Sequence, residues 1–305
     1  MKPIICIAGP TASGKSGFAV RLAKAVGGEV INADALQVYA DLSVLSARPT
    51  EDEMDGVPHH LFGHVAGDVR YSTGAWLRDV EPVILDCLAR EVVPIIVGGT
   101  GLYFKALLIG MADIPAVPND VRHETQALYD VQGIAPIRAV AEGVDPVAAA
   151  RVLGDDPQRL MRIINVARAT GKPLSYWQAE THPVVPSRFA RFCVLTEPRD
   201  TLYARIDARY DAMLRTGGLE EAKRMFESGY DDGLPVMKAI GLRQLRSYFN
   251  GIKSLDEAVE DAQRESRRFA KRQMTWFRNQ PPQGERLTDR DAQLRFIADV
   301  QGLAF

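Results

Sequence analysis

Short apolar runs alternate with helix-like segments through the first hundred residues of the chain. Residues 4–8, IICIA, form an uninterrupted apolar run of the kind found in buried parallel strands, and a glycine follows them. Apolar residues then recur at helical spacing over residues 18–26, up to Gly27 and Gly28, and residues 29–32 read as a second strand. Strand, helix and strand in about thirty residues make a βαβ unit, so the pattern predicts an α/β fold with a parallel sheet.

The rest of the chain continues this sheet and interrupts it once. A helical pattern over 74–90 leads into an apolar strand at 92–97, and another strand is predicted at 191–195. Between them, residues 115–186 are helical, broken at Pro136, Pro146 and Pro157, and contain no convincing strand. We therefore expect a core of residues 1–114 and 187–305 and an all-helical insertion domain at 115–186. Helices are also predicted at 201–226, interrupted by two glycines, and at 255–278, whereas the tail after residue 282 has no clear pattern.

The composition is that of an ordinary globular protein. The 305 residues are 46% hydrophobic and 25% charged, and 37 basic residues against 39 acidic ones exclude a polycation that coats nucleic acid. Cys6, Cys87 and Cys193 lie far apart, so neither a disulfide framework nor a zinc site is indicated. No stretch approaches the roughly 18 to 20 apolar residues of a membrane span, so we expect a cytoplasmic protein with no membrane partner.

The segment after the first strand, GPTASGKS, has the spacing of the ATP-binding phosphate loop (P-loop), G-x-x-x-x-G-K-[ST]. A strand before it and a helix after it are the context in which backbone N–H groups cradle a di- or triphosphate. Lys15 would balance phosphate charge, and the Ser16 hydroxyl would bind Mg²⁺. The predicted fold class is therefore a P-loop NTPase-like parallel sheet flanked by helices. The predicted phosphate-binding residues are Gly9, Pro10, Thr11, Ala12, Ser13, Gly14, Lys15 and Ser16.

Two residues after the next strands should share the pocket, because the carboxyl ends of parallel strands open into one crevice. Asp34 would be a general base, an indirect Mg²⁺ ligand, or only a turn residue, and Thr100 would face the phosphates or only shape its turn. A second apolar strand ending in a magnesium-ordering aspartate is missing, since VILD at 83–86 lies in a helix-period segment. A motor-type ATP hydrolase is disfavoured, and a transferase with a diphosphate leaving group stays open.

Basic residues gather near the end of the chain. Residues 264–278 hold six basic residues and one acid, and five of the six follow i, i+3, i+4 spacing, so a helix would present them on one face. Such a face suits a phosphate backbone, or is merely a solvated helix surface. The insertion adds Arg159 and Arg162 on one helix face. His59 and His60 are adjacent and point to different sides, which favours a polar-network role over a shared metal site.

With these motifs the chain resembles the bacterial tRNA dimethylallyltransferases, also called tRNA isopentenyltransferases. The resemblance rests on ordered blocks through most of the chain, namely GPTASGKS at 9–16, DALQVY at 34–39, GVPHHL at 56–61, GGTGLYFKALL at 98–108, DPQRLMR at 156–162, TGKPLS at 170–175, KAIGLRQ at 238–244 and RRFAKRQMTWFR at 267–278. Two positions depart from the family pattern: Ala35 stands where serine is common, and Arg48 stands where the family has a lysine.

The resemblance implies transfer of a dimethylallyl group from its diphosphate to the exocyclic amine of the adenosine just 3′ of the anticodon, in tRNAs that read codons beginning with U. Asp34, Thr100 and Lys15 would be catalytic, residues 9–16 would hold the diphosphate with Mg²⁺, and the protein would act as a monomer on the tRNA anticodon stem-loop. Family positions that contact tRNA match Asp34, Ala35, Leu36, Gln37, Thr100, Arg122, Gln158, Arg159, Leu160, Met161, Arg162, Lys238, Ala239, Ile240, Gly241, Leu242 and Arg243. From the basic stripe, Arg267 and Arg272 join this set.

Two other functions use the same motifs. In a small-molecule kinase the loop would bind ATP, Asp34 would accept a hydroxyl proton and the helical insertion would be a lid. In a nucleotide-dependent RNA-binding module there would be no turnover with any donor. The acceptor separates them, because only an RNA substrate needs a large basic surface.

Overall fold

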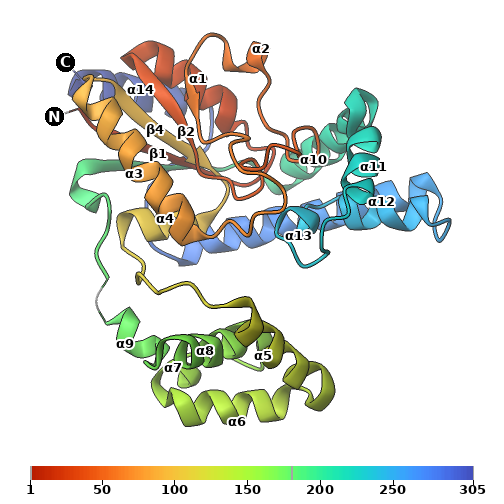
Figure 1. Cartoon of the computed structure of the whole chain (residues 1–305). Helices are drawn as coiled ribbons and strands as arrows, with labels where there is room; N and C mark the ends of the chain where they lie inside the picture. Colours follow the sequence, from red (N-terminus) through yellow and green to blue (C-terminus); the bar gives the residue numbers. More distant parts are fainter. Residues whose placement is uncertain (1, 180, 305) are drawn as a thin grey trace. The chain divides into compact units, whose positions relative to one another are not determined.

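A computed structural model describes residues 2–179 and 181–304 of the chain. Its centre is a six-stranded sheet in the order β3-β2-β4-β1-β5-β6, and every pairing in it is parallel (Figure 1). The strands are β1 (Ile4–Ala8), β2 (Gly28–Asn32), β3 (His59–His60), β4 (Val93–Gly98), β5 (Ala190–Leu195) and β6 (Glu285–Leu287). Because all strands point the same way, the loops that follow them open at one edge of the sheet.

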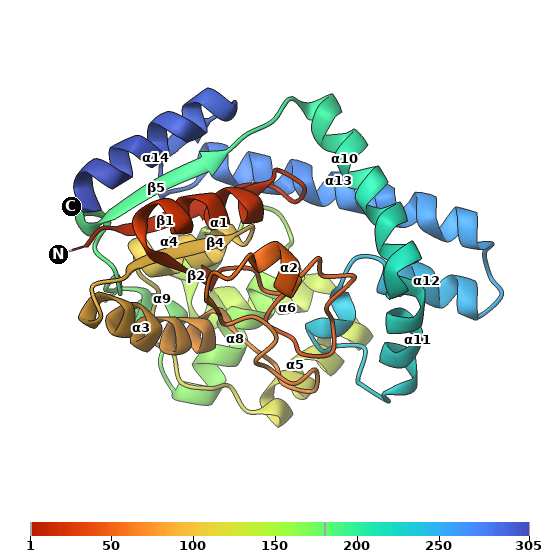
Figure 2. The ribbon, with the colours of Figure 1, turned by 90° about the horizontal axis from the view of Figure 1, so that it is seen from above.

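Helices cover both faces of this sheet, so the core has three layers (Figure 2). Alternate residues of β1 serve the two faces: Ile5 and Ile7 pack under α1 (Lys15–Val26) and α14 (Arg290–Ala304), and Ile4 and Cys6 pack under the other layer. That layer consists of α3 (Thr73–Ala89), α4 (Gly101–Leu108) and the end of α13 (Leu255–Asn279). Strands buried on both faces explain why β1 and β4 read as continuous apolar runs.

A third apolar cluster forms among helices that follow β5. The helices are α10 (Arg199–Met213), α11 (Leu219–Glu227) and α12 (Leu242–Phe249), and they pack with the first half of α13. A π-helical turn, Leu214–Gly218, joins α10 to α11, and Gly217 has φ 105°, which breaks the helix where the sequence predicted an interruption. Elsewhere in residues 1–109 and 184–305, the remaining short elements are α2 (Glu51–Met54) and the 3₁₀ turns Ser187–Phe189 and Val236–Lys238.

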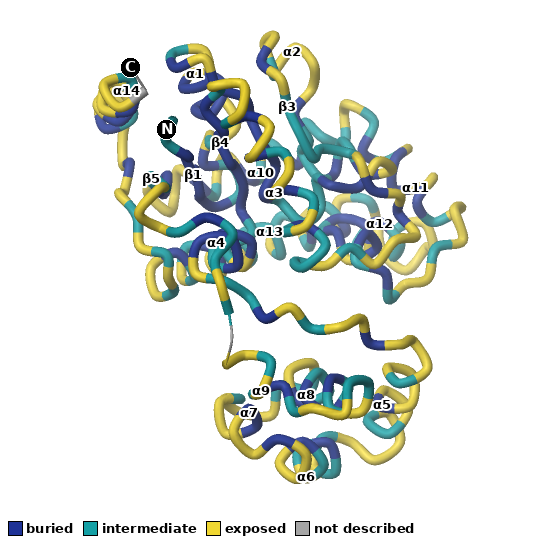
Figure 3. Tube along the Cα trace, turned by 60° about the vertical axis from the view of Figure 1, so that its left-hand side comes forward, coloured by how far each residue is buried: buried dark blue, intermediate teal, exposed yellow. Residues whose placement is uncertain are grey.

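Residues 110–183 form a separate compact unit from residues 1–109 and 184–305. It contains α5 (Asn119–Gln132), α6 (Ile134–Val144), α7 (Pro146–Ala150), α8 (Pro157–Thr170) and α9 (Leu174–Gln178), and no strand lies in its described residues. Its core is apolar, with Ile137, Leu160 and Ile164 fully buried (Figure 3). The domain boundaries predicted from the sequence, 115 and 186, lie within five residues of the ends of this unit.

The predicted strands at 29–32, 92–97 and 191–195 correspond to β2, β4 and β5, and VILD at 83–86 is helical, inside α3. In the described residues two strands, β3 and β6, and four helices, α2, α4, α12 and α14, lie where the sequence predicted no element. β3 has two residues and β6 has three, too few for a periodic pattern, and α14 follows in the tail that had no clear pattern. In the described residues no helix is both long and apolar enough to span a membrane.

Glu29 joins β2 to its neighbours through an ion pair between its buried carboxylate and the exposed guanidinium of Arg90. Both guanidinium Nη atoms of Arg90 donate to its carboxylate, at 2.7 and 2.8 Å, and His60 Nε2 lies 2.7 Å from Oε2. Glu29, His60 and Cys87 also bring three metal-ligating atoms within 4.8 Å of one another. Arg90 already supplies the positive charge there, so we interpret the cluster as a structural polar network, the role predicted for the histidine.

The Glu29 network should make stability depend on pH in a defined window. The hydrogen bonds from Arg90 lower the pKa of Glu29 to about 2, from 4.5. A carboxyl whose folded pKa is depressed stabilises the fold above the unfolded pKa and loses that contribution as pH falls through the folded pKa. We therefore expect the free energy of unfolding to drop between pH 4.5 and 2, and Glu29→Gln to be less stable at pH 7 with a flatter profile. Urea denaturation at stepped pH measures this. Glu81→Gln, at an exposed position of α3, is the control. Equal pH profiles of the unfolding free energy for wild type and Glu29→Gln would contradict a stabilising role for the Glu29 carboxylate.

Candidate active site

The phosphate loop leaves β1 at Gly9 and enters α1 at Lys15. Gly14 has φ 80° and Ala12 has φ 61°, so the loop includes left-handed residues of the kind that turn successive N–H groups to one side. Gly9 is required by packing, because a Cβ there would lie 2.8 Å from Ser13 Oγ and 3.0 Å from the Leu195 carbonyl oxygen. Residues 9–16 therefore have the backbone shape that the motif predicts for an anion cradle.

A cavity of about 710 Å³ opens beside this loop and is lined by Lys15, Ser16 and Arg209. The Lys15 ammonium donates to the Pro10 carbonyl at 3.2 Å. Burial lowers the pKa of Lys15 to about 8, the nearby Asp34 carboxylate opposes this shift, and Arg209 adds to it. The exposed Ser16 at the start of α1 offers a hydroxyl in the same cavity, with the carboxylate of Glu53 also in its wall, and oxygen ligands of this kind fit a Mg²⁺ that also binds a diphosphate.

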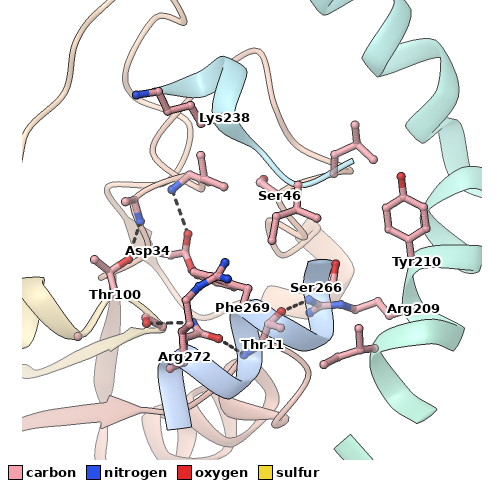
Figure 4. A pocket seen from close by; sticks show the side chains of 18 of the residues that line it. Thr11, Asp34, Ser46, Thr100, Arg209, Tyr210, Lys238, Ser266, Phe269 and Arg272 are labelled. Carbon is pink, nitrogen blue, oxygen red and sulfur yellow. Dashed lines mark hydrogen bonds between the residues drawn. The ribbon is translucent and has the colours of Figure 1, made fainter. Parts of the chain in front are cut away.

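A second cavity, of about 480 Å³, lies beyond the carboxyl ends of β2 and β4. Asp34 and Thr100 both line it, together with Thr11 of the phosphate loop (Figure 4). Asp34 Oδ1 accepts the N–H of Leu36 at 3.0 Å, which is the turn role foreseen for this residue, while Oδ2 faces Gly99, 3.5 Å from where a Cβ would be. One carboxylate oxygen therefore fixes the turn, and the other lies near the cavity.

Thr100 holds the two strand ends together as well as lining the cavity. Its hydroxyl accepts the Ala35 N–H at 3.0 Å, and its own N–H donates to the Ala33 carbonyl at 3.3 Å. The strand ends can approach this closely only because residue 98 is glycine: a Cβ there would lie 2.0 Å from the Ala33 carbonyl oxygen. Thr100 thus both shapes the turn and faces the cavity, so the two interpretations of this residue are compatible.

Two residues that the sequence did not single out complete the site. The buried side chain of Gln273 on α13 accepts the Thr11 N–H at 2.9 Å and donates to the Gly99 carbonyl at 2.9 Å. Arg209 on α10 donates to the Thr11 hydroxyl and lines both cavities. Burial lowers the pKa of Arg209, and Asp34 opposes the shift. Arg209 therefore places a guanidinium, with no carboxylate hydrogen-bonded to it in the described residues, beside the phosphate cradle.

The walls of this second cavity, called the main cavity from here on, divide into a polar and an apolar part. The polar groups include those of Asp34, Thr100, Lys238, Arg272 and Gln273, and the apolar ones include Leu36, Leu45, Ile206, Met213, Ile240, Phe269 and Trp276. Figure 4 shows Arg209 and Tyr210 on one helix, across the cavity from Asp34 and Thr100. Leu45 and Ser46 belong to a loop held by the buried Glu221, whose carboxylate accepts the N–H groups of residues 43, 44 and 45 at 2.7 to 2.9 Å. A small apolar group and a planar base could both be accommodated in such a cavity.

The predicted tRNA-contact residues do not all reach a surface. Asp34, Ala35, Leu36, Thr100, Lys238, Ile240 and Arg272 line the main cavity. The amide of Gln37 instead donates to the carbonyls of Ser46 and Ala47, and Ala239 and Leu242 are buried core residues. Gly241 has φ 104° and serves the turn before α12. Arg243 lies in a shallow hollow with Arg264 and Arg268.

Four of the six basic residues in the stripe on α13 form ion pairs, one of them with another helix. Arg267 is half-buried and pairs with Asp207 on α10, whereas Arg268 and Arg272 pair with Glu265 on their own helix. Arg264 pairs with Asp261. Helical spacing places Arg267 beside the other basic residues, but it cannot say that α10 packs against this edge of the stripe. Phe269 and Trp276 of the same helix line the cavity beside Arg272.

In the helical unit, Arg122 of α5 and Arg162 of α8 are close enough to affect each other. Burial lowers the pKa of Arg162, and the charge of Arg122 adds to the shift. Arg159 pairs with Asp156 at the start of α8. Leu160, which the family comparison placed at the tRNA, is fully buried, so its side chain serves the core of this unit. The exposed Gln158 and the half-buried Met161 lie on the same helix.

A loop of P-loop shape beside a cavity lined by a carboxylate is the arrangement expected in a P-loop transferase or kinase. Comparison with known families identifies it further. The model described as IPP transferase matches residues 37–280, and the one described as isopentenyl transferase matches residues 2–61. The chain belongs to the IPP transferase family.

Individual relatives agree over nearly the whole chain. The tRNA dimethylallyltransferase of Phenylobacterium zucineum is 48% identical over 99% of both chains, and that of Maricaulis maris is 45% identical over 98% of both. Among solved structures, the tRNA isopentenylpyrophosphate transferase of Bacillus halodurans has a TM-score of 0.70 and 33% identity, covering 100% of this chain and 97% of that one. A eukaryotic dimethylallyltransferase acting on tRNA has a TM-score of 0.79 and 28% identity, covering 91% of this chain and 70% of its own.

The lowered pKa of Lys15 gives the site a testable pH limit. A lysine with a pKa of about 8 loses its ammonium charge as pH rises through 8, so the free enzyme should bind a diphosphate monoester more weakly above that pH. We expect kcat/KM for dimethylallyl diphosphate to fall up to tenfold per pH unit above about 8. In Lys15→Arg the side chain stays charged, so this limb should disappear whatever the remaining activity. Lys24→Arg, further along the same helix, is the control, and an unmoved limb in Lys15→Arg would assign it to another group.

Proposed function

We propose that this protein transfers a dimethylallyl group from dimethylallyl diphosphate to the exocyclic amine of the adenosine 3′-adjacent to the anticodon, in tRNAs that read codons beginning with U. The carrying observation is that the diphosphate cradle and the Asp34 carboxylate meet at Thr11: Thr11 belongs to the phosphate loop and lines the same cavity as Asp34. Donor and acceptor would then meet within that cavity. The named activities of the relatives support the same reaction.

In this mechanism, the C1–O bond of the donor breaks with its electron pair going to the diphosphate. Lys15, Arg209 and the loop N–H groups stabilise the negative charge that develops there. Mg²⁺, held at Ser16 together with the diphosphate, would neutralise further charge on the leaving group. The amine nitrogen forms the new bond to C1, and Asp34 Oδ2 accepts the proton that the nitrogen loses. The apolar walls keep water away from the allylic carbon.

The base must leave its stack to reach a cavity inside the protein, and an anticodon loop presents unpaired bases that can do so. Trp276 and Phe269 line the cavity and offer aromatic surfaces to a flipped base. Lys238 and Arg272, also in its walls, would contact phosphates. Arg122 and Arg162 of the helical unit offer a second pair of guanidiniums for the RNA backbone.

The deciding assay incubates the purified protein and Mg²⁺ with radiolabelled dimethylallyl diphosphate and unmodified tRNA. The tRNA carries adenosines at the last anticodon position and the next two, and ATP consumption is followed in parallel. Label in RNA that requires those adenosines, without ATP use, is the expected result. ATP consumption with no label transferred would favour the kinase, and RNA binding without any turnover would favour the binding module. The family match supports the transferase over the kinase.

Asp34→Asn isolates the proton-acceptor role, because an asparagine can still accept the Leu36 N–H. We expect turnover to fall by about 10² to 10⁴, the usual contribution of a general base, with tRNA affinity within a few-fold of wild type. Rapid-quench kinetics and filter binding measure the two quantities. Asp41→Asn, outside the cavity, is the control, and near-normal turnover in Asp34→Asn would remove Asp34 from the base role.

If the basic residues of α13 contact phosphates, they should increase the salt dependence of tRNA binding. Arg267→Ala together with Arg272→Ala should weaken binding and flatten the slope of log K against log salt, by about 0.7 for each lost phosphate contact. Most of this change should come from Arg272, because Arg267 is half-buried against Asp207. Single variants measured from 50 to 300 mM salt separate the two. An unchanged slope in the double variant would mean that the stripe is only a solvated surface.

A further inference from the structure

The side chain of Gln273 connects the donor half of the site to the acceptor half. It lies on α13, is 5% exposed, and makes one hydrogen bond to each half. Its Oε1 accepts from Thr11 N–H in the phosphate loop, and its Nε2 donates to the Gly99 carbonyl after β4. These contacts join segments 262 and 174 residues away from it in sequence.

The link continues from Gly99 to the catalytic carboxylate. Thr100 follows Gly99 and accepts the N–H of Ala35, which is the residue after Asp34. Asp34 is then fixed by its own bonds to the Asn32 side chain and to Leu36 N–H. The path from the phosphate loop to Asp34 therefore runs through Gln273. It consists of hydrogen bonds of 2.8 to 3.0 Å and of steps between residues adjacent in the chain.

The space around Gln273 leaves its amide one arrangement. A Cβ at position 99 would lie 2.3 Å from its Nε2, so residue 99 must be glycine for the amide to reach the backbone. On the same helix, Trp276 packs so closely on Gly101 that a Cβ there would lie 2.1 Å from its indole ring. Phe277 is buried in the cluster beneath the sheet. These contacts hold this part of α13 rigidly against the loop that follows β4.

We propose that Gln273 is a positioning residue for prenyl transfer: it sets the separation between the phosphate loop and the Asp34–Thr100 pair. In a displacement at carbon, the attacking nitrogen, C1 and the leaving oxygen must be in line, and an error of about 1 Å can cost about 10²-fold in rate. Gln273 also occupies the Thr11 N–H, so the diphosphate binds to the later amides of the loop. The inference rests on the proposed function, because it concerns the alignment of that donor with that acceptor.

The test compares Gln273→Met with Gln263→Met. Gln263 lies on the same helix and donates to the Asp207 carbonyl and to Asp211 of α10, so its substitution removes similar interhelical bonds away from the cavity. For Gln273→Met we expect kcat to fall by about 10²-fold. The KM for the donor and the Kd for tRNA should change less than about threefold. Gln263→Met should lower the thermal midpoint and leave kcat within about twofold.

A second readout separates alignment from stability. In wild type, one diphosphate should be released for each prenyl group in RNA; misaligned enzyme should release more, because water captures the ionised donor. Gln273→Glu, nearly isosteric, keeps an acceptor for Thr11 N–H but loses the donor to Gly99, and it serves if the methionine variant does not fold. It too should show lower kcat and excess diphosphate release.

The outcomes distinguish the two proposals. If wild type transfers prenyl groups and both Gln273 variants keep the kcat and the one-to-one release of Gln263→Met, Gln273 has only a structural role and the inference is wrong. If wild type transfers no prenyl group to RNA from dimethylallyl diphosphate, the proposed function itself is wrong and the inference falls with it.

Discussion

The parallel direction of all six strands is the constraint on which the site depends. It brings the ends of β1, β2 and β4 to one edge, so that a phosphate cradle, a carboxylate and a threonine from distant parts of the sequence become neighbours. The close approach of these strand ends then needs glycine: a side chain at residue 98 would collide with the Ala33 backbone. Asp34 lies where it does because the sheet is packed tightly one residue before it.

The sequence was sufficient for the elements that have a pattern of their own. Runs of four to six consecutive apolar residues mark β1, β4 and β5, and a glycine-rich turn marks the start of α1. β3 and β6 have only two and three residues, and they exist because an edge strand was available to pair with them. α14 completes the layer over β1 and β5 by burying Phe296 and Val300, a tertiary reason that no local pattern expresses.

The candidate site divides in the same way. Lys15, Ser16, Asp34 and Thr100 follow directly after strands or within a motif, so their position could be inferred from the strand that precedes them. Arg209 and Gln273 lie in the middle of helices, where one arginine or glutamine looks like any other surface residue. Arg267 is the reverse case, since its spacing suited a basic face and could not show that it pairs with Asp207 of α10. Only the packing of α10 and α13 on the loops distinguishes these three positions from ordinary surface positions.

Arginines differ in whether an acid is hydrogen-bonded to them, and this difference bears on where phosphate can bind. Most cations of α13 are compensated by carboxylates of Asp207, Asp261 or Glu265, and phosphates that bind there must compete with them. Arg209 beside the phosphate loop and Arg162 near Arg122 are different, because burial lowers the pKa of each. The charge of Arg122 adds to the shift at Arg162, whereas the carboxylates of Asp34 and Glu53 oppose it at Arg209. The cost of desolvating these guanidiniums is already present in the folded protein, and an arriving anion would relieve it. We therefore expect phosphate to bind best at these two arginines, one in each unit.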